Sequence, residues 1–349
     1  MKYTFEITIA GCAANCAHCY VDGGPGAMMP CEYYVLCLEK LVPALDRLQG
    51  DIALNLGNET FCHPHAAALF RLTDQICPRY FDRRGEDFPT TGVALLRHRD
   101  RENILLELKR KGISELFFAV HGGEREHDAI VGFSGRYGQL FETADFLTAQ
   151  GFSVGFSLML TKAFLPGLDE VMSRILRYPG ARIRPIVPLY VPTDRMRRYQ
   201  QYRASAPELL TICHRLEKYG VDTEKVRRLC RECTQRAIRQ RGMDVDTEYA
   251  AAPQWAFFHI DRDLRLYYGN AGMHTQYLGD LRQMDSDAVY AAIAPFGANY
   301  DFDAFFPPEA FHRLAVQLPR LPANDLVYPS RADCYYAWLD ELCERHLLI

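Results

Sequence analysis

The sequence has 349 residues, 48% hydrophobic and 24% charged, and its 40 Lys and Arg against 44 Asp and Glu give a formal net charge of -4. These values are typical of a folded globular protein with one large or two ordinary domains, and they exclude a disordered or fibrous chain. The nearly balanced charge argues against general binding to nucleic acid or to a membrane surface.

Strand-like and helix-like patterns alternate through the first half of the chain. The predicted strands are 3–10, 51–56, 87–95, 116–121, 152–160 and 183–189, and the predicted helices are 31–48, 66–76, 101–111 and 137–150. Alternation with short connections indicates parallel strands joined by right-handed crossovers. We therefore predict an α/β fold in which residues 1–192 form a partial (β/α)6 barrel, since a full eight-unit barrel takes ~250 residues.

The pattern changes in the second half, which we expect to form a smaller α+β domain over residues 193–349. Two helices are predicted at 207–219 and 223–241, then a β-hairpin from 255–260 and 264–268, and a last helix from about Arg331. Residues 195–241 contain 13 Lys and Arg against 5 Asp and Glu. Such a charge run is typical of a solvated helix face, and the alternative is a surface for an acidic partner or peptide.

The chain has twelve cysteines, a high number for its length. It begins without a secretory signal pattern, and no stretch reaches the roughly 18 apolar residues of a membrane span. We therefore expect a protein of the reducing cytoplasm without a membrane anchor, whose cysteines are buried, catalytic or metal-bound.

Three cysteines form the pattern C-x3-C-x2-C directly after the first predicted strand: Cys12, Cys16 and Cys19. Thiolates hold iron–sulfur clusters, and three of them leave one iron of a four-iron cluster without a protein ligand. A structural zinc site normally takes four protein ligands, and His18 lies too close to Cys19 in sequence to reach the same ion easily. The spacing favours an iron–sulfur cluster, with a non-catalytic zinc-binding protein as the alternative.

This loop resembles the signature of the radical S-adenosylmethionine (SAM) superfamily. The resemblance implies a [4Fe–4S] cluster on Cys12, Cys16 and Cys19, with SAM bound to the open iron. It implies reductive cleavage of SAM to a 5′-deoxyadenosyl radical that abstracts a substrate hydrogen, with flavodoxin or ferredoxin as reducing partner. His18 occupies a position whose backbone contacts adenine in the family.

Two further segments resemble the SAM-binding segments of the family. Gly57, Asn58 and Glu59 end the second predicted strand and are similar to a Gly-Gly-Glu motif whose carboxylate accepts hydrogen bonds from the SAM ammonium. Thr90 and Thr91 follow the third strand and are similar to its threonine-bearing strand end. Because Glu59 lies at a strand end, we expect removal of its side chain to open no cavity in the core.

Two polar residues on later strands complete the candidate site. His121 ends the fourth predicted strand and is expected to face the radical as a catalytic residue, since carboxyl ends of parallel strands bind ligands in open α/β sheets. Ser157 lies in the fifth strand and is expected to contact SAM. For both residues, the alternative is a hydrogen-bonded polar residue packed under a loop.

The hairpin at 255–268 resembles the SPASM and twitch extensions of the family, which carry further clusters. Residues 269–272 read Gly-Asn-Ala-Gly where a cysteine is expected, and Cys230 and Cys233 fit an apolar helix stripe with Val226 and Leu229. The sequence therefore predicts a single cluster and a C-terminal region that closes the barrel, and the alternative is an auxiliary cluster on Cys230, Cys233 and two other cysteines. Cys334 and Cys343, nine residues apart, would face opposite sides of one helix.

The resemblance leaves the substrate open between a small polar metabolite and a peptide. A ribosomal-peptide maturase of the SPASM or twitch type is one alternative, and the basic segment at 195–241 would suit an acidic leader peptide. The chain begins at its first strand, so we expect no peptide-recognition domain before the barrel, which gives a metabolite at least equal weight with a peptide.

Overall fold

The computed structural model describes residues 2–19, 23–26, 28–57, 59–80, 87–191, 193–241, 255–270, 273–297, 316–317, 321 and 324–346. The chain divides into two compact units. Unit 1 comprises Met1–Asn15, Val21–Ser114 and Ala252–Phe305, and unit 2 comprises Cys16–Tyr20, Glu115–Ala251 and Phe306–Ile349. The predicted domain boundary at residue 192 stays a prediction.

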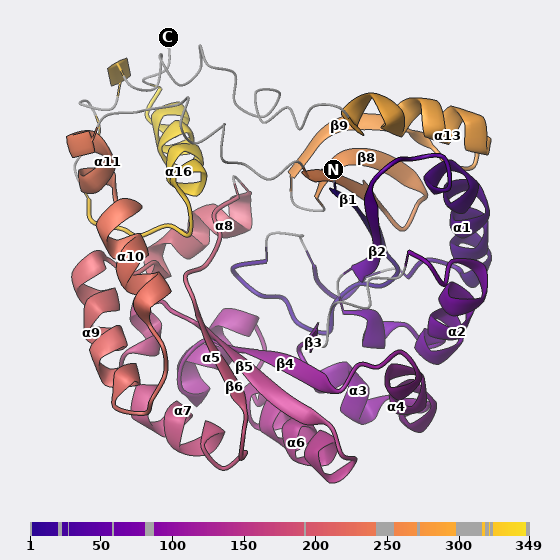
Figure 1. Ribbon diagram of the computed structural model, residues 1–349. Coiled ribbons are helices and arrows are strands. Elements are labelled where there is room, and N and C mark those ends of the chain that lie inside the picture. The colour runs from indigo at the N-terminus through magenta and orange to yellow at the C-terminus, as the bar shows by residue number, and fades with distance from the viewer. Residues whose placement is uncertain are drawn as a thin grey trace. The chain divides into compact units, whose positions relative to one another are not determined.

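Unit 1 contains a mixed five-stranded sheet in the order β2-β1-β7-β8-β9 (Figure 1). Its strands are β1 (Lys2–Thr8), β2 (Asp51–Gly57), β7 (Trp255–Ile260), β8 (Arg265–Asn270) and β9 (Met273–Asp280). β1 runs parallel to both β2 and β7, whereas β7, β8 and β9 are antiparallel neighbours. The predicted hairpin is confirmed, and the sequence did not indicate that it continues the first sheet beside β1.

The two faces of β1 differ in burial, as alternation along a strand requires. Tyr3, Phe5 and Ile7 are buried in the core of unit 1, and the ring of Phe5 stacks on that of Phe258 at 4.8 Å. The helices that supply this core are α1 (Cys31–Leu45), α2 (Ala66–Ile76) and α13 (Ser286–Ile293). The opposite face of β1 is polar and half-buried, and it includes Glu6 and Thr8.

The third predicted strand is shorter than its pattern indicated. β3 spans Asp87–Thr90, and α3 (Val93–Arg97) follows at once, so the predicted strand over 87–95 is wrong in its second half. Gly92 has φ 77°, a left-handed conformation that ends the extended backbone and places Val93 at the start of the helix. The other described helices of unit 1 are η1 (Thr60–Cys62), α4 (Arg101–Arg110) and η4 (Ala294–Gly297).

Unit 2 contains three parallel strands with β5 (Ser153–Met159) between β4 (Glu115–Val120) and β6 (Arg182–Ile186). The helices between them are α5 (Glu124–Val131), α6 (Arg136–Ala149), η2 (Lys162–Phe164) and α7 (Leu168–Ile175). Parallel strands with helical connections confirm the predicted α/β class. The short helices α5 and α7 were not predicted, because eight residues carry little periodicity.

The second half of unit 2 is helical. Its helices are α8 (Asp194–Tyr199), η3 (Gln200–Tyr202), α9 (Ala206–Glu217), α10 (Glu224–Glu232), α11 (Gln235–Arg241) and α16 (Arg331–Glu344). The single helix predicted at 223–241 is wrong, because Thr234 forms a β-bridge with Val327, and the Cys233 carbonyl accepts the Tyr328 N–H. These contacts take backbone groups that a continuous helix needs.

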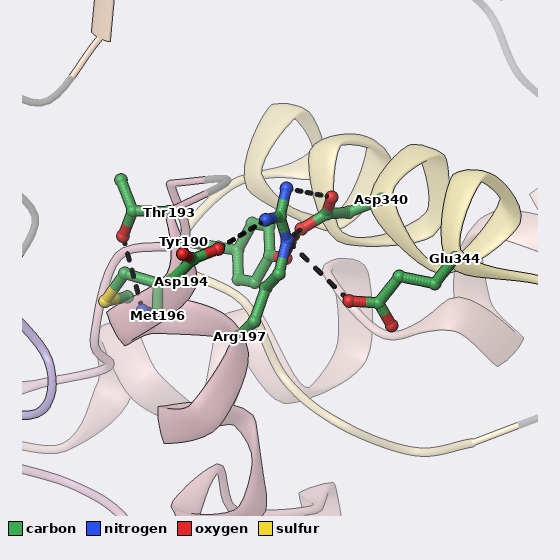
Figure 2. A network of polar contacts seen from close by, with 7 residues as sticks. All are labelled: Tyr190, Thr193, Asp194, Met196, Arg197, Asp340 and Glu344. Carbon is green, nitrogen blue, oxygen red and sulfur yellow. Dashed lines mark hydrogen bonds and ion pairs between the residues drawn. The ribbon is translucent and has the colours of Figure 1, made fainter.

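A polar network joins α16 to α8 and the segment before it (Figure 2). The Arg197 guanidinium donates to both carboxylate oxygens of Asp340, each at 2.7 Å, and the Tyr190 hydroxyl donates to the same carboxylate. Arg197 also pairs with the exposed Asp194 at 2.9 Å. Within the described ranges, no helix has both the length and the apolar character needed to cross a membrane.

Candidate active site

Cys12 follows β1 in a tightly packed loop of unit 1. Its N–H donates to the Gly24 carbonyl at 2.8 Å, and the Ala14 N–H donates to its Sγ at 3.4 Å. A Cβ on Gly11 would lie 2.4 Å from the Gly24 oxygen, so only glycine permits this approach of the two loop segments. The loop therefore fixes the backbone that presents Cys12.

Cys16 and Cys19 lie in the part of the loop that belongs to unit 2. The Cys19 N–H donates to the Cys16 carbonyl at 3.2 Å, and the Ala17 N–H between them donates to the Ile130 carbonyl of α5 at 2.8 Å. The segment carrying these two thiols is thus tied to a helix that follows β4.

The donor set suits an iron–sulfur cluster. All three thiols are half-buried, and none of the twelve cysteines forms a disulfide. Thiolates are the usual ligands of such clusters, and hydrogen bonds to sulfur of the kind that Cys12 accepts tune them. Within either unit, the described residues contain no group of three His, Cys, Asp or Glu side chains that could hold a metal ion. The cluster assignment therefore rests on the motif and stays a prediction.

Glu59 lies just beyond the carboxyl end of β2 and is only 4% exposed. Its Oε1 accepts the Thr90 hydroxyl at 2.8 Å, and its Oε2 accepts the Thr91 N–H at 2.6 Å. Burial raises the pKa of this carboxyl, and the hydrogen bonds from Thr91 and Thr90 oppose that shift. Each oxygen has a second lone pair, so the carboxylate can also accept from a ligand ammonium.

The structure thus brings together Glu59, Thr90 and Thr91, which the sequence predicted separately. It also corrects the expectation that the Glu59 side chain can be removed without opening the core, because this carboxylate is buried and holds the end of β3. Gly57 is buried, and a Cβ there would lie 2.4 Å from the Glu6 carboxylate, so a larger residue would displace the Glu6 side chain. Asn58 lies outside the described residues.

His18 and His121 form an aromatic pair in unit 2. Their ring centroids are 4.3 Å apart, and His18 also contacts Tyr199 while His121 contacts His127. His121 is 1% exposed, and among the described residues neither its Nδ1 nor that of His18 has a hydrogen-bond partner. Burial lowers the pKa of both imidazoles, to about 4 for His18, so both rings are neutral near pH 7.

The buried position of His121 bears on its predicted catalytic role. Its ring packs against that of His18, which lies between Cys16 and Cys19. Within unit 2, His121 therefore supports the cysteine loop. Ser157 lies half-buried in β5, between Ala119 and Arg184 of the neighbouring strands. The catalytic role of His121 and the SAM contact of Ser157 stay predictions.

A polar pair at the carboxyl end of β1 was missed by the sequence analysis. The Thr8 hydroxyl and the His259 Nε2 lie 2.8 Å apart, and His259 is 4% exposed and stacked on Tyr267. Its place on β7 became relevant only because β7 pairs in parallel with β1 in the structure. The sequence predicted the hairpin that carries His259 but not the strand beside which it lies.

The other candidate ligands, Cys230 and Cys233, are both buried. Burial raises the pKa of the Cys230 thiol to about 12, which favours the neutral thiol over a metal-binding thiolate. Cys334 is buried and Cys343 exposed on α16, as their spacing predicted.

Several solved structures share this architecture. One, native anSMEcpe with bound AdoMet (SAM) and the Cp18Cys peptide, has 12% identity and a TM-score of 0.53, covering 99% of this chain and 98% of that chain. Native anSMEcpe with bound AdoMet gives 12% and 0.51, with the same coverage. Streptococcus suis SuiB bound to precursor peptide SuiA gives 10% and 0.50, covering 86% of this chain and 66% of that one.

These neighbours are radical SAM enzymes. This chain has their α/β fold. At 10 to 12% identity the likeness concerns the fold alone, and the present chain spans just under two thirds of SuiB. No protein-family model and no curated protein sequence matches the chain.

Proposed function

We propose that this chain is a radical SAM enzyme. The observation that carries the proposal is the three-cysteine loop at the end of β1, in a chain with the radical SAM fold. A second feature supports it, because the buried Glu59 carboxylate with Thr90 and Thr91 forms a negative site suited to the ammonium of SAM.

The site residues have distinct proposed roles. Cys12, Cys16 and Cys19 hold the [4Fe–4S] cluster, which when bound supplies the electron that cleaves SAM to a 5′-deoxyadenosyl radical. Glu59 orients SAM by accepting a hydrogen bond from its ammonium. That cation in turn favours the ionised form of the buried carboxyl. His18 and His121 remain uncharged, so they shape the site without adding positive charge.

We propose a peptide as the substrate, with a small polar metabolite as the second candidate. The support is that two structures of the same fold carry peptides, namely Cp18Cys in anSMEcpe and SuiA in SuiB. The buried arrangement of His121 favours neither class. A reduced flavodoxin or ferredoxin is the proposed electron donor.

The test is an anaerobic assay of the reconstituted protein with SAM, a reductant and candidate substrates. We expect a brown protein that releases 5′-deoxyadenosine, with release accelerated by peptides more than by metabolites. A colourless protein that binds zinc and leaves SAM intact would instead establish the zinc-binding alternative.

A further inference from the structure

A pocket of about 610 Å³ in unit 1 opens beside Cys12. Its wall comes from the cysteine loop, the segment around Gly26 and Met28, the η1 turn with Phe61, and the end of α3 with the residues after it. This volume is within the range of ligand and anchor sites in proteins, about 300–1,000 Å³. A predicted cluster ligand therefore lies at an accessible surface feature.

The pocket is positively charged, although the whole chain has a net charge of -4. Arg97 and Arg99 line it, both are exposed, and neither has an ion pair within the part of the chain that the structure describes. A guanidinium nitrogen of Arg262 lies 3.1 Å from where a Cβ on Gly26 would be, which puts a third arginine next to a lining residue. Among the described residues, none that lines the pocket is Asp or Glu.

His98 also lines the pocket but adds no charge. Its Nδ1 accepts the Asp100 N–H at 3.0 Å, so its Nε2 carries the proton and donates to the His63 carbonyl at 3.0 Å. The positive potential thus comes from arginines, which remain charged at every physiological pH.

Apolar side chains accompany these charges. Met28 on the pocket wall is 43% exposed, unusual for a large hydrophobic residue, and the buried Phe61 also lines the pocket. Arginine and methionine around an apolar centre are the composition enriched at protein–protein interfaces.

The pocket is not the SAM site. Glu59, Thr90 and Thr91 are absent from its lining. SAM also carries a positive sulfonium, which three arginines without a carboxylate would repel. The features favour an anionic partner that must come close to Cys12.

We infer that this pocket docks an acidic one-electron donor protein, an inference that rests on the proposed function. The donor's reduced cofactor loses one electron and the cluster on Cys12 gains it, so no other reactant is needed. Arg97, Arg99 and Arg262 steer the acidic surface of the donor, and Met28 provides an apolar contact at the docked position.

The test uses the reconstituted protein and a purified flavodoxin. Arg97→Glu/Arg99→Glu reverses the charge of the pocket, and Arg198→Glu/Arg228→Glu makes the same change at exposed arginines of the basic segment in unit 2. Calorimetry measures binding of oxidised flavodoxin, and stopped-flow absorbance measures cluster reduction by reduced flavodoxin. Photoreduced deazaflavin, a small uncharged donor, checks that each cluster is intact.

We expect the pocket variant to bind flavodoxin at least about ten-fold more weakly and to be reduced about ten- to hundred-fold more slowly at low salt. High salt should shrink the difference, because it screens exposed charges. The unit 2 variant and Arg97→Lys/Arg99→Lys should behave like the wild type, and deazaflavin should reduce all of them equally.

Equal flavodoxin binding by the pocket variant and the wild type would overturn the inference. So would an equal loss in the unit 2 variant, which would indicate a general charge effect. Weaker binding of an acidic peptide substrate, with unchanged flavodoxin binding, would assign the pocket to the substrate instead. A wild-type protein that deazaflavin cannot reduce would refute the proposed function rather than the docking surface.

Discussion

Burial of the Glu59 side chain disfavours its charged form. Two donors, the Thr90 hydroxyl and the Thr91 N–H, stabilise the carboxylate. We predict that Glu59→Gln weakens SAM binding about ten- to hundred-fold, because a charge-assisted hydrogen bond is worth about 1.5–3 kcal/mol. Glutamine keeps the shape of the side chain and one carbonyl oxygen, so folding should change little. Titration with SAM and urea unfolding measure the two effects separately.

Glu59→Ala should differ from Glu59→Gln in stability as well. It leaves the Thr90 hydroxyl and the Thr91 N–H without their acceptor, which costs about 1–3 kcal/mol. Glu102→Gln, at an exposed carboxylate of α4, is the matched control and should change neither quantity. Unchanged SAM affinity in a folded Glu59→Gln protein would remove Glu59 from the binding site.

His127 makes stability depend on pH. Burial lowers its pKa from 6.5 to about 4, so the unfolded chain takes up the proton first as the pH falls. Its contribution is complete above pH 6.5 and is lost as the pH falls from 6.5 towards 4, by about 3 kcal/mol in total.

His127→Gln should flatten the pH dependence in urea unfolding, since glutamine does not titrate and can still accept the His121 N–H. His214→Gln, at an exposed histidine of α9, should leave the dependence as in the wild type. Parallel curves for the wild type and His127→Gln would show that His127 is not held neutral by burial.

At the scale of elements, Arg197 of α8 pairs with two carboxylates of α16, closely with Asp340 and at 3.7 Å with Glu344 (Figure 2). Asp340 is 7% exposed and serves both Arg197 and the Tyr190 hydroxyl. We predict that Asp340→Ala lowers the free energy of unfolding by about 1–3 kcal/mol, less than a fully buried pair would because Arg197 is partly exposed.

Asp194→Ala removes a carboxylate partner of the same arginine that lies on α8 itself. Asp194 is 80% exposed on its side chain, and such pairs contribute about 0–1 kcal/mol. The losses in free energy of unfolding of the two variants should therefore differ clearly when measured by thermal or urea unfolding. A loss for Asp194→Ala as large as for Asp340→Ala would contradict the assigned importance of burial.

Cys230 and Cys233 are predicted to be packing residues and not ligands of a second cluster. Cys230→Ala/Cys233→Ala should keep the iron content of the wild type and lose stability, because two buried thiols leave small cavities. Iron analysis and urea unfolding check both. A loss of about four irons per chain would instead assign an auxiliary cluster to this pair.

Most elements of the first half could be predicted from periodicity, because β1, β2 and α2 alternate or repeat regularly. The end of β3 could not, since the left-handed conformation of Gly92 is a property of the folded backbone. The break at Thr234 was equally hidden, because its bridge to Val327 joins residues nearly a hundred positions apart.

The candidate site likewise contains residues that the sequence predicted and a pairing that depends on the fold. Its cysteines and Glu59 were visible because they follow strands at characteristic spacings. The pairing of Thr8 with His259 was not, because it depends on β7 lying next to β1.

At the scale of the whole molecule, the central claim is that Cys12, Cys16 and Cys19 hold one cluster that cleaves SAM. Six of the twelve cysteines are not buried, namely these three and Cys31, Cys62 and Cys343. Two triple variants, each replacing one set of three by Ala, therefore form a matched pair with equal losses of accessible thiols.

The deciding measurement is iron content together with 5′-deoxyadenosine release for the two triple variants after anaerobic reconstitution. We predict that the Cys12→Ala/Cys16→Ala/Cys19→Ala protein folds. It should hold no iron and release no 5′-deoxyadenosine. The Cys31→Ala/Cys62→Ala/Cys343→Ala protein should retain the wild-type iron content and SAM cleavage. A Cys12/Cys16/Cys19 variant that keeps its iron and still cleaves SAM would contradict the assignment.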